Sequence, residues 1–318
     1  GQVPERKRLV VTTRREGERR AGSDASGPVR FSDRVVLIFV DGLGVGDGGR
    51  DDPTRTYSGD LFDWSRSGAA WRPIDALLGI SGIPQSATGQ TSLFTGRNAQ
   101  AVLGHHSTGF PGPVLREMLR EHSLLKTLIE HSRSAAFLNA FRPLFWELSE
   151  AKRWTLSAST VANLAADLPF FTLDDLASER SVYQDVTNGD LRRRGFDVPE
   201  WTPGHAGRVL ARNVGRFDFT LFEYFKTDKA GHTQDRESCE SVLQELDGFV
   251  RAYLEAVPPG TLTLLTSDHG NIEDLGTRSH TINPVPLMAW GPGETDALAA
   301  CADLTDIAPF ILSRFVLP

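Results

Sequence analysis

The chain has 318 residues, 40% of them hydrophobic, and a formal net charge of -7. This length allows one large core with an inserted second unit, and the acidic balance argues against a nucleic-acid-binding protein, which would show a basic face. No apolar run approaches the roughly 18 residues that a membrane span requires. We therefore expect no nucleic-acid partner, no membrane partner and a cytoplasmic location.

The first 33 residues differ in composition from the rest of the chain. Arginines are frequent there among Gly, Ser and Glu, and Leu9-Val10-Val11 is the only apolar run. A segment of this kind buries too little apolar surface to fold. We predict that residues 1–33 form a disordered basic tail.

Beyond residue 33, short β-rich apolar runs alternate with amphipathic helical stripes. The predicted strands are 35–40, 135–138, 217–225, 261–266 and 285–290, and the predicted helices are 115–131, 202–214, 242–254 and 304–315. This alternation predicts an α/β fold, with a mostly parallel doubly wound sheet flanked by helices. The rhythm fails in residues 141–200, which we interpret as a small cap inserted into a core of residues 34–140 and 201–318.

Acidic and imidazole side chains gather next to these predicted strands. Asp41 follows the first strand, Asp228 and His232 follow the strand that ends at residue 225, Asp268-His269 follows Thr261–Thr266, and His280 precedes the last strand. Open parallel sheets bind ligands beyond the carboxyl ends of their strands. An adjacent carboxylate and imidazole are costly to bury without a partner. Together the clusters predict a two-metal hydrolytic or phosphoryl-transfer site.

Each cluster alone also fits an ordinary structural role. Asp41 suits a turn before Gly42, Asp228 suits a helix cap, and a loop position explains His280 equally well. The run Gly44 to Gly49 has the spacing of a dinucleotide-binding loop, but the polar, proline-containing segment after it does not open a helix. The nicotinamide interpretation is therefore disfavoured.

The segment Gly82 to Arg97 is typical of a turn that leads into a short helix, with hydroxyl residues near the helix N-terminus. The free N–H groups and the dipole at such a terminus stabilise an alkoxide or a bound phosphate. Ordinary helix capping by Ser or Thr is the alternative.

Taken in order, these motifs resemble those of the alkaline-phosphatase superfamily, nearest to its cofactor-independent phosphoglycerate mutase and phosphopentomutase branch. The resemblance rests on Asp41-Gly42, the Gly82-x-Pro84 turn with Gly89-Gln90-Thr91, Asp228 with His232, Ser267 to Glu273, and His280 to Pro286. It implies one metal ion bound by Asp228, His232 and His280. It implies a second bound by Asp41, Asp268, His269 and the nucleophile Thr91. Mn²⁺ and Zn²⁺ both suit such ligands.

On this basis we predict a hydrolase that cleaves a small phosphate ester through a phosphothreonine at Thr91. Gln90, Lys226 and Arg278 lie next to mapped ligands and are predicted to hold phosphate oxygens. Where the mutases have Glu-Val-Gly-His, this chain has Leu93-Phe94-Thr95-Gly96, which weakens the case for a mutase. Two alternatives stay open: a phosphomutase acting on a phosphosugar or a phosphoglycerate-like substrate, and a catalytically silent metal-binding protein.

Overall fold

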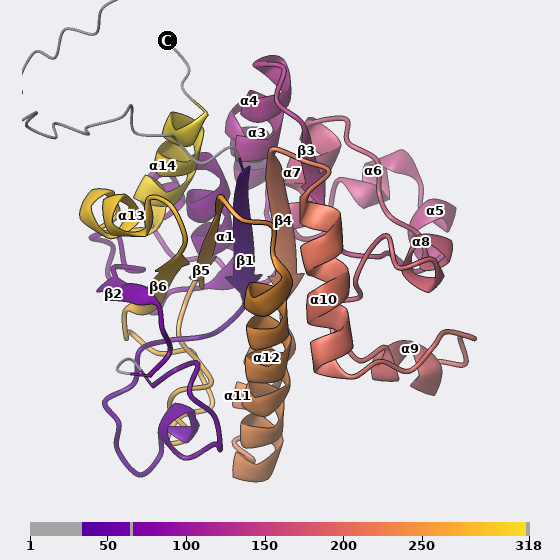
Figure 1. Ribbon diagram of the computed structural model, residues 1–318. Helices are drawn as coiled ribbons and strands as arrows, with labels where there is room; N and C mark the ends of the chain where they lie inside the picture. Colours follow the sequence, from indigo (N-terminus) through magenta and orange to yellow (C-terminus); the bar gives the residue numbers. More distant parts are fainter. Residues whose placement is uncertain (1–33, 64–65, 316–318) are drawn as a thin grey trace, which may run out of the picture. The chain divides into compact units, whose positions relative to one another are not determined.

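The computed structural model describes residues 34–63 and 66–315, which form a six-stranded sheet between helices (Figure 1). The predicted disordered tail, residues 1–33, lies outside the described residues. None of the helices in the described part of the chain is both long and apolar enough to cross a membrane.

The strand order of the sheet is β2-β6-β5-β1-β4-β3. The strands are β1 (Arg34–Val40), β2 (Ala70–Ile74), β3 (Ala135–Phe137), β4 (Phe219–Tyr224), β5 (Thr261–Thr266) and β6 (Val285–Trp290). Strands β5, β1, β4 and β3 run parallel, whereas β6 is antiparallel to both of its neighbours. The predicted fold class, a mostly parallel α/β sheet flanked by helices, is confirmed.

The central strand β1 is buried on both faces, which explains its continuous run of Val, Leu, Ile and Phe. Val36, Ile38 and Val40 join one hydrophobic cluster with α10 (Pro203–Val214) and α12 (Arg236–Ala256). The alternate side chains of β1 join a second cluster with α1 (Ser86–Thr95), α3 (Pro113–His122), α4 (Leu124–Glu130), α7 (Ala158–Ala165) and α14 (Ile307–Arg314). Helices therefore cover both faces of the sheet.

Several predicted elements have different bounds in the structure. The helix predicted over residues 115–131 divides at Ser123, whose hydroxyl accepts a hydrogen bond from the Lys126 N–H and caps α4. The helix predicted from Leu304 begins as the 3-10 helix η2 (Leu304–Asp306) before α14. The remaining short elements are η1 (Pro53–Arg55), α2 (Ala99–Leu103), α11 (Lys226–Gly231) and α13 (Glu294–Ala300).

Residues 141–200 contain the short helices α5 (Leu144–Glu147), α6 (Glu150–Arg153), α8 (Leu173–Ala177) and α9 (Gly189–Arg193), together with α7. Leu176, Val182 and Leu191 of this segment belong to the same hydrophobic cluster as the central strand. The segment therefore shares the core of the sheet. Its role as a cap stays a prediction.

Candidate metal centre

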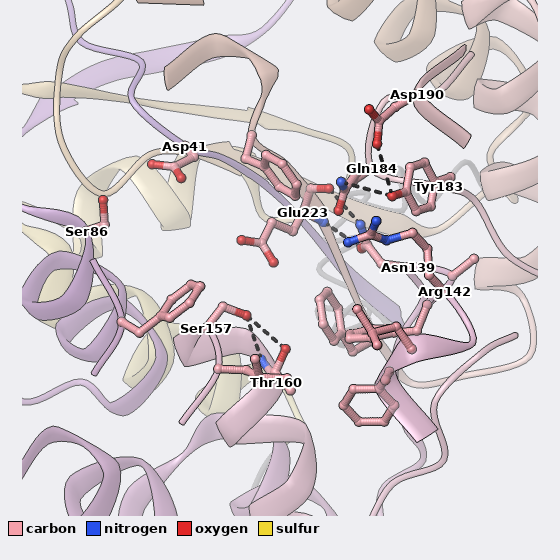
Figure 2. A pocket seen from close by; sticks show the side chains of 18 of the residues that line it. Asp41, Ser86, Asn139, Arg142, Ser157, Thr160, Tyr183, Gln184, Asp190 and Glu223 are labelled. Carbon is pink, nitrogen blue, oxygen red and sulfur yellow. Dashed lines mark hydrogen bonds between the residues drawn. The ribbon is translucent and has the colours of Figure 1, made fainter. Parts of the chain in front are cut away.

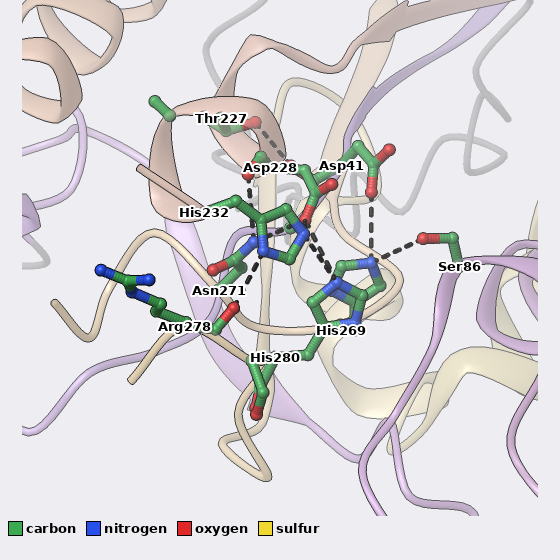
Figure 3. A network of polar contacts seen from close by, with 12 residues as sticks. Asp41, Ser86, Thr227, Asp228, His232, His269, Asn271, Arg278 and His280 are labelled. Carbon is green, nitrogen blue, oxygen red and sulfur yellow. Dashed lines mark hydrogen bonds and ion pairs between the residues drawn. The ribbon is translucent and has the colours of Figure 1, made fainter. Parts of the chain in front are cut away.

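The predicted ligands converge at one edge of the sheet, beyond the carboxyl ends of three neighbouring parallel strands. Asp41 follows β1, Asp228 lies in α11 just after β4, and Asp268-His269 follows β5. His232 lies at the end of α11, and His280 lies in the loop before β6. Figure 3 shows the side chains of Asp41, Asp228, His232, His269 and His280 directed toward one another.

Two glycines allow the elements at this edge to approach closely. A Cβ atom on Gly42, which has a φ of +71°, would lie 2.8 Å from the Asp228 Cβ. A Cβ atom on Gly89, within α1, would lie 2.6 Å from the carbonyl oxygen of Asp268. Glycine at these positions therefore lets α11 and α1 pack against the strand ends that carry the ligands.

Three donor atoms form a tight group at the first predicted metal position. Asp228 Oδ1 lies 3.4 Å from His232 Nε2 and 3.4 Å from His280 Nε2, and the two imidazole nitrogens are 3.3 Å apart. Asn271 fixes the carboxylate, because its Nδ2 donates a 2.6 Å hydrogen bond to Asp228 Oδ1.

A second group of donor atoms surrounds His269. Its Nε2 lies 3.2 Å from Asp41 Oδ1 and 3.6 Å from Asp268 Oδ2. The hydroxyl oxygen of Ser86 lies 3.0 Å from the same nitrogen. The rings of His269 and His280 stack with their centroids 3.7 Å apart, so the two groups of donors are adjacent.

The three histidines are oriented alike by backbone carbonyls. Nδ1 lies 3.0 Å from the Arg278 carbonyl in His232, 3.2 Å from the Gly270 carbonyl in His269, and 3.1 Å from the Pro84 carbonyl in His280. Because a carbonyl only accepts hydrogen bonds, each Nδ1 carries the proton in these contacts. In the neutral ring, each Nε2 then presents a lone pair to the centre, which is the arrangement that metal-binding histidines adopt.

The site concentrates negative charge. Burial raises the pKa of Asp41 well above its ordinary value, and repulsion from Asp268 raises it further. Burial alone would lower the pKa of His269, but the carboxylates of Asp268, Asp41 and Asp228 outweigh it and raise that pKa to about 10. The site therefore favours bound positive charge.

These observations fit bound divalent cations. Ligands at about 2.0–2.1 Å from a tetrahedral Zn²⁺ are about 3.3–3.4 Å apart, close to the spacing of the first group. Asp41 Oδ1 is also buried without a hydrogen-bond partner among the described residues. A cation in the second group would satisfy that oxygen, and a cation in the first group would lie between the facing nitrogens of His232 and His280.

The structure gives the hydroxyls of Thr91 and Ser86 different surroundings. Thr91 is fully buried within α1, and its hydroxyl donates a 2.6 Å hydrogen bond to the Ala87 carbonyl of the same helix. Ser86 is the first residue of α1 and lines the cavity beside Asp41. The Ser86 hydroxyl thus lies next to the predicted ligands, and the nucleophilic role of Thr91 stays a prediction.

The three residues predicted to hold phosphate have separate surroundings. Gln90 lines the cavity and donates a 3.0 Å hydrogen bond to Asp268 Oδ2, so it supports a ligand. Lys226 forms an ion pair with Glu245, and Arg278 Nε donates to Gln234 Oε1 at 2.7 Å. Neither Lys226 nor Arg278 lines the cavity, and their predicted role in holding phosphate stays a prediction.

A cavity of about 560 Å³ opens beside the metal centre. In Figure 2, Asp41 and Ser86 lie on one side of it, Asn139, Arg142 and Tyr183 lie on the other, and Glu223 lies between them. Burial raises the pKa of Glu223 to about 7, although Ser159 donates a hydrogen bond to its carboxyl group. Sequence reasoning missed Glu223, because it lies within an apolar strand pattern.

Comparisons with known proteins agree with this geometry. Residues 207–318 match the family model "Metalloenzyme superfamily", and this segment carries Asp228, His232, Asp268, His269 and His280. Residues 207–318 are therefore similar to the metalloenzyme superfamily. The predicted resemblance to the alkaline-phosphatase superfamily is thereby confirmed.

Curated relatives match a limited part of this chain. A 2,3-bisphosphoglycerate-independent phosphoglycerate mutase of Halobacterium salinarum is 40% identical over 106 residues, which is 30% of this chain and 20% of the relative. The enzyme of the same name from Syntrophotalea carbinolica is 30% identical over 136 residues, 41% of this chain and 26% of the relative. The chain thus spans about a quarter or less of these relatives' length in the matched region.

Among solved structures, the PH0037 protein of Pyrococcus horikoshii is similar in fold to this chain. The two share 15% sequence identity with a TM-score of 0.55, over 88% of this chain and 96% of the other. This likeness supports the architecture of the sheet and its helices.

Proposed function

We propose that this protein is a metal-dependent phosphoryl-transfer enzyme that acts on a small phosphate ester, with Ser86 as its nucleophile. The observation that carries the proposal is the position of the Ser86 hydroxyl. It lies at the N-terminus of α1, 3.0 Å from the Nε2 atom of His269. The metal-binding roles of Asp41, Asp228, His232, Asp268, His269 and His280 form part of the same proposal.

Divalent cations at these ligands would lower the pKa of a bound hydroxyl and stabilise charge on phosphoryl oxygens. The Ser86 hydroxyl gives its proton to solvent as Oγ attacks phosphorus, the Oγ–P bond forms, and the bond from phosphorus to the ester oxygen breaks. The leaving oxygen takes a proton and departs as an alcohol. The transferred group would lie at the N-terminus of α1, where the helix dipole favours its negative charge.

We propose water as the acceptor in the second step, which releases inorganic phosphate and regenerates the Ser86 hydroxyl. The second candidate is a phosphomutase, which returns the phosphoryl group to a different oxygen of the substrate. The names of the curated relatives favour this alternative. Phosphate release during turnover of an ester indicates the hydrolase, whereas isomerisation of 3-phosphoglycerate without free phosphate indicates the mutase.

The test compares two hydroxyl deletions within one helix. In protein reconstituted with Mn²⁺ or Zn²⁺, we expect Ser86→Ala to lower the turnover of p-nitrophenyl phosphate by about 10³-fold or more. Thr91→Val removes the hydroxyl that the sequence analysis predicted as the nucleophile, and we expect this variant to retain turnover. Acid quenching followed by peptide mass spectrometry should locate a phosphoryl group on Ser86. Full turnover in Ser86→Ala, or a phosphoryl group on Thr91, would overturn the assignment.

A further inference from the structure

The cavity beside the metal centre has an apolar wall that the chemistry of phosphoryl transfer does not need. Its lining includes Phe110, Phe141, Leu144, Phe145, Leu148 and Leu156. Most of these residues come from the segment between β3 and α7, and Phe110 comes from the loop before α3. The wall is therefore built by parts of the chain that carry none of the proposed metal ligands.

Contacts between aromatic rings within this wall, and with Phe170 behind it, hold the wall in place. The ring centroids of Phe141 and Phe145 are 4.9 Å apart, and Phe170 lies 4.8 Å from Phe141 and 4.5 Å from Phe145. Such close tilted and edge-on contacts are favourable beyond the burial of area. The cluster therefore presents a preformed apolar surface to the cavity.

Two large apolar side chains of the wall are exposed to solvent. Phe110 is 62% exposed and Leu144 is 54% exposed, although both line the cavity. Exposed apolar side chains that gather at a concave site mark a surface that a ligand covers. A short polar ester bound at Ser86 would leave this surface in water.

We infer that the substrate is a phosphate ester whose alcohol carries a bulky aromatic or branched apolar group, which lies against Phe110, Phe141 and Leu144. This inference rests on the proposed function, because it places the phosphate at Ser86. The volume of about 560 Å³ supports it, since pockets of about 300–1,000 Å³ hold ligands of drug size. Phe110, Phe141 and Leu144 determine specificity in this account.

The experiment compares esters of equal chemical reactivity. Propyl phosphate and 3-phenylpropyl phosphate have similar alkyl leaving groups and differ by one phenyl ring. For the metal-loaded protein we expect kcat/KM to be about 10- to 100-fold higher for the phenyl ester, the gain from burying a group of that size. Equal values for the two esters, or a higher value for 3-phosphoglycerate, would overturn the inference.

Variants and a binding assay separate this inference from the proposed function. Phe110→Ala combined with Leu144→Ala should reduce the preference for the phenyl ester, whereas Val102→Ala, an exposed apolar residue outside the cavity, should preserve it. Calorimetry with propyl phosphonate and 3-phenylpropyl phosphonate measures the same preference without turnover. Tighter binding of the phenyl ligand without hydrolysis of either ester would contradict the proposed function and support the inferred apolar binding surface. Hydrolysis of both esters with equal binding of both ligands would support the proposed function and contradict the inferred apolar binding surface.

Discussion

Glu223 provides a quantitative test of the electrostatics of the cavity. Its carboxyl group is buried at the end of β4, and burial raises its pKa from 4.5 to about 7. Glu223→Gln replaces the titratable group with a neutral amide of similar shape, whose oxygen still accepts the hydrogen bond from Ser159. The substitution therefore removes the proton equilibrium and leaves the packing nearly unchanged.

The sign of the effect follows from the raised pKa. The folded protein holds the proton more tightly than the unfolded chain, so the protonated carboxyl costs nothing below pH 4.5. Between pH 4.5 and about 7 the unfolded chain loses this proton while the folded protein keeps it, so stability falls with rising pH and levels off once the folded carboxyl group ionises. A pKa change from 4.5 to about 7 corresponds to a loss on the order of 3 kcal/mol at high pH.

The assay is urea unfolding of metal-depleted parent and Glu223→Gln proteins between pH 4.5 and pH 9. We expect nearly equal stabilities at the acidic end and a variant more stable by up to about 3 kcal/mol above pH 8. Glu255→Gln, which alters an exposed carboxylate on α12, is the control and should show no such divergence. A difference in the free energy of unfolding between Glu223→Gln and parent that stays constant across this pH range would show that the pKa of Glu223 is not raised.

Two further substitutions test how the ligands are positioned. Gly89→Ala should displace α1 from Asp268 and destabilise the protein by about 1–3 kcal/mol in denaturant unfolding. The control is Gly204→Ala in α10, which meets only ordinary contacts and should be tolerated. Equal stabilities of the Gly89→Ala and Gly204→Ala proteins would contradict the close packing of α1. Asn271→Ala removes the hydrogen bond to Asp228 Oδ1 and should weaken binding of one metal ion by about 10- to 100-fold in competition with a chelator; unchanged affinity would show that Asn271 does not orient the ligand.

Much of the fold and the metal centre follows from local sequence patterns. The strand Arg34–Val40 is buried on both faces, so its apolar run was unambiguous. Asp41 and Asp268 directly follow such strands, and parallel topology brings the ends of these strands to one edge of the sheet. Their convergence could therefore be predicted without coordinates.

The nucleophile position depended on a helix boundary. Ser86 and Thr91 are five residues apart in one segment, and only the helix start decides which hydroxyl faces the centre. The helix begins at Ser86, so Thr91 lies one and a half turns inside it and bonds to its own backbone. Helix boundaries are set by tertiary packing as well as by sequence, so the motif alone did not single out Ser86, the nucleophile that we propose.

Proximity in sequence to a predicted ligand did not show which residues line the cavity. Lys226 precedes Asp228 by two residues, and positions two apart on a helix point in different directions. Lys226 consequently pairs with Glu245 of α12 instead of facing the cavity. The apolar wall combines Phe110 with residues of the segment after β3, and no local pattern joins these distant parts of the chain.

The number of metal ions bound per chain is the decisive measurement for the proposed two-metal centre. We expect metal-depleted parent protein, titrated with Zn²⁺ or Mn²⁺ and measured by calorimetry and elemental analysis, to bind two ions per chain. Asp228→Ala and Asp268→Ala should each lose one ion, from different groups of donors, whereas Glu255→Ala should retain both. Two results would rule out the two-metal centre. One is a parent protein that binds one ion or none, and the other is that Asp228→Ala and Asp268→Ala each still bind two ions.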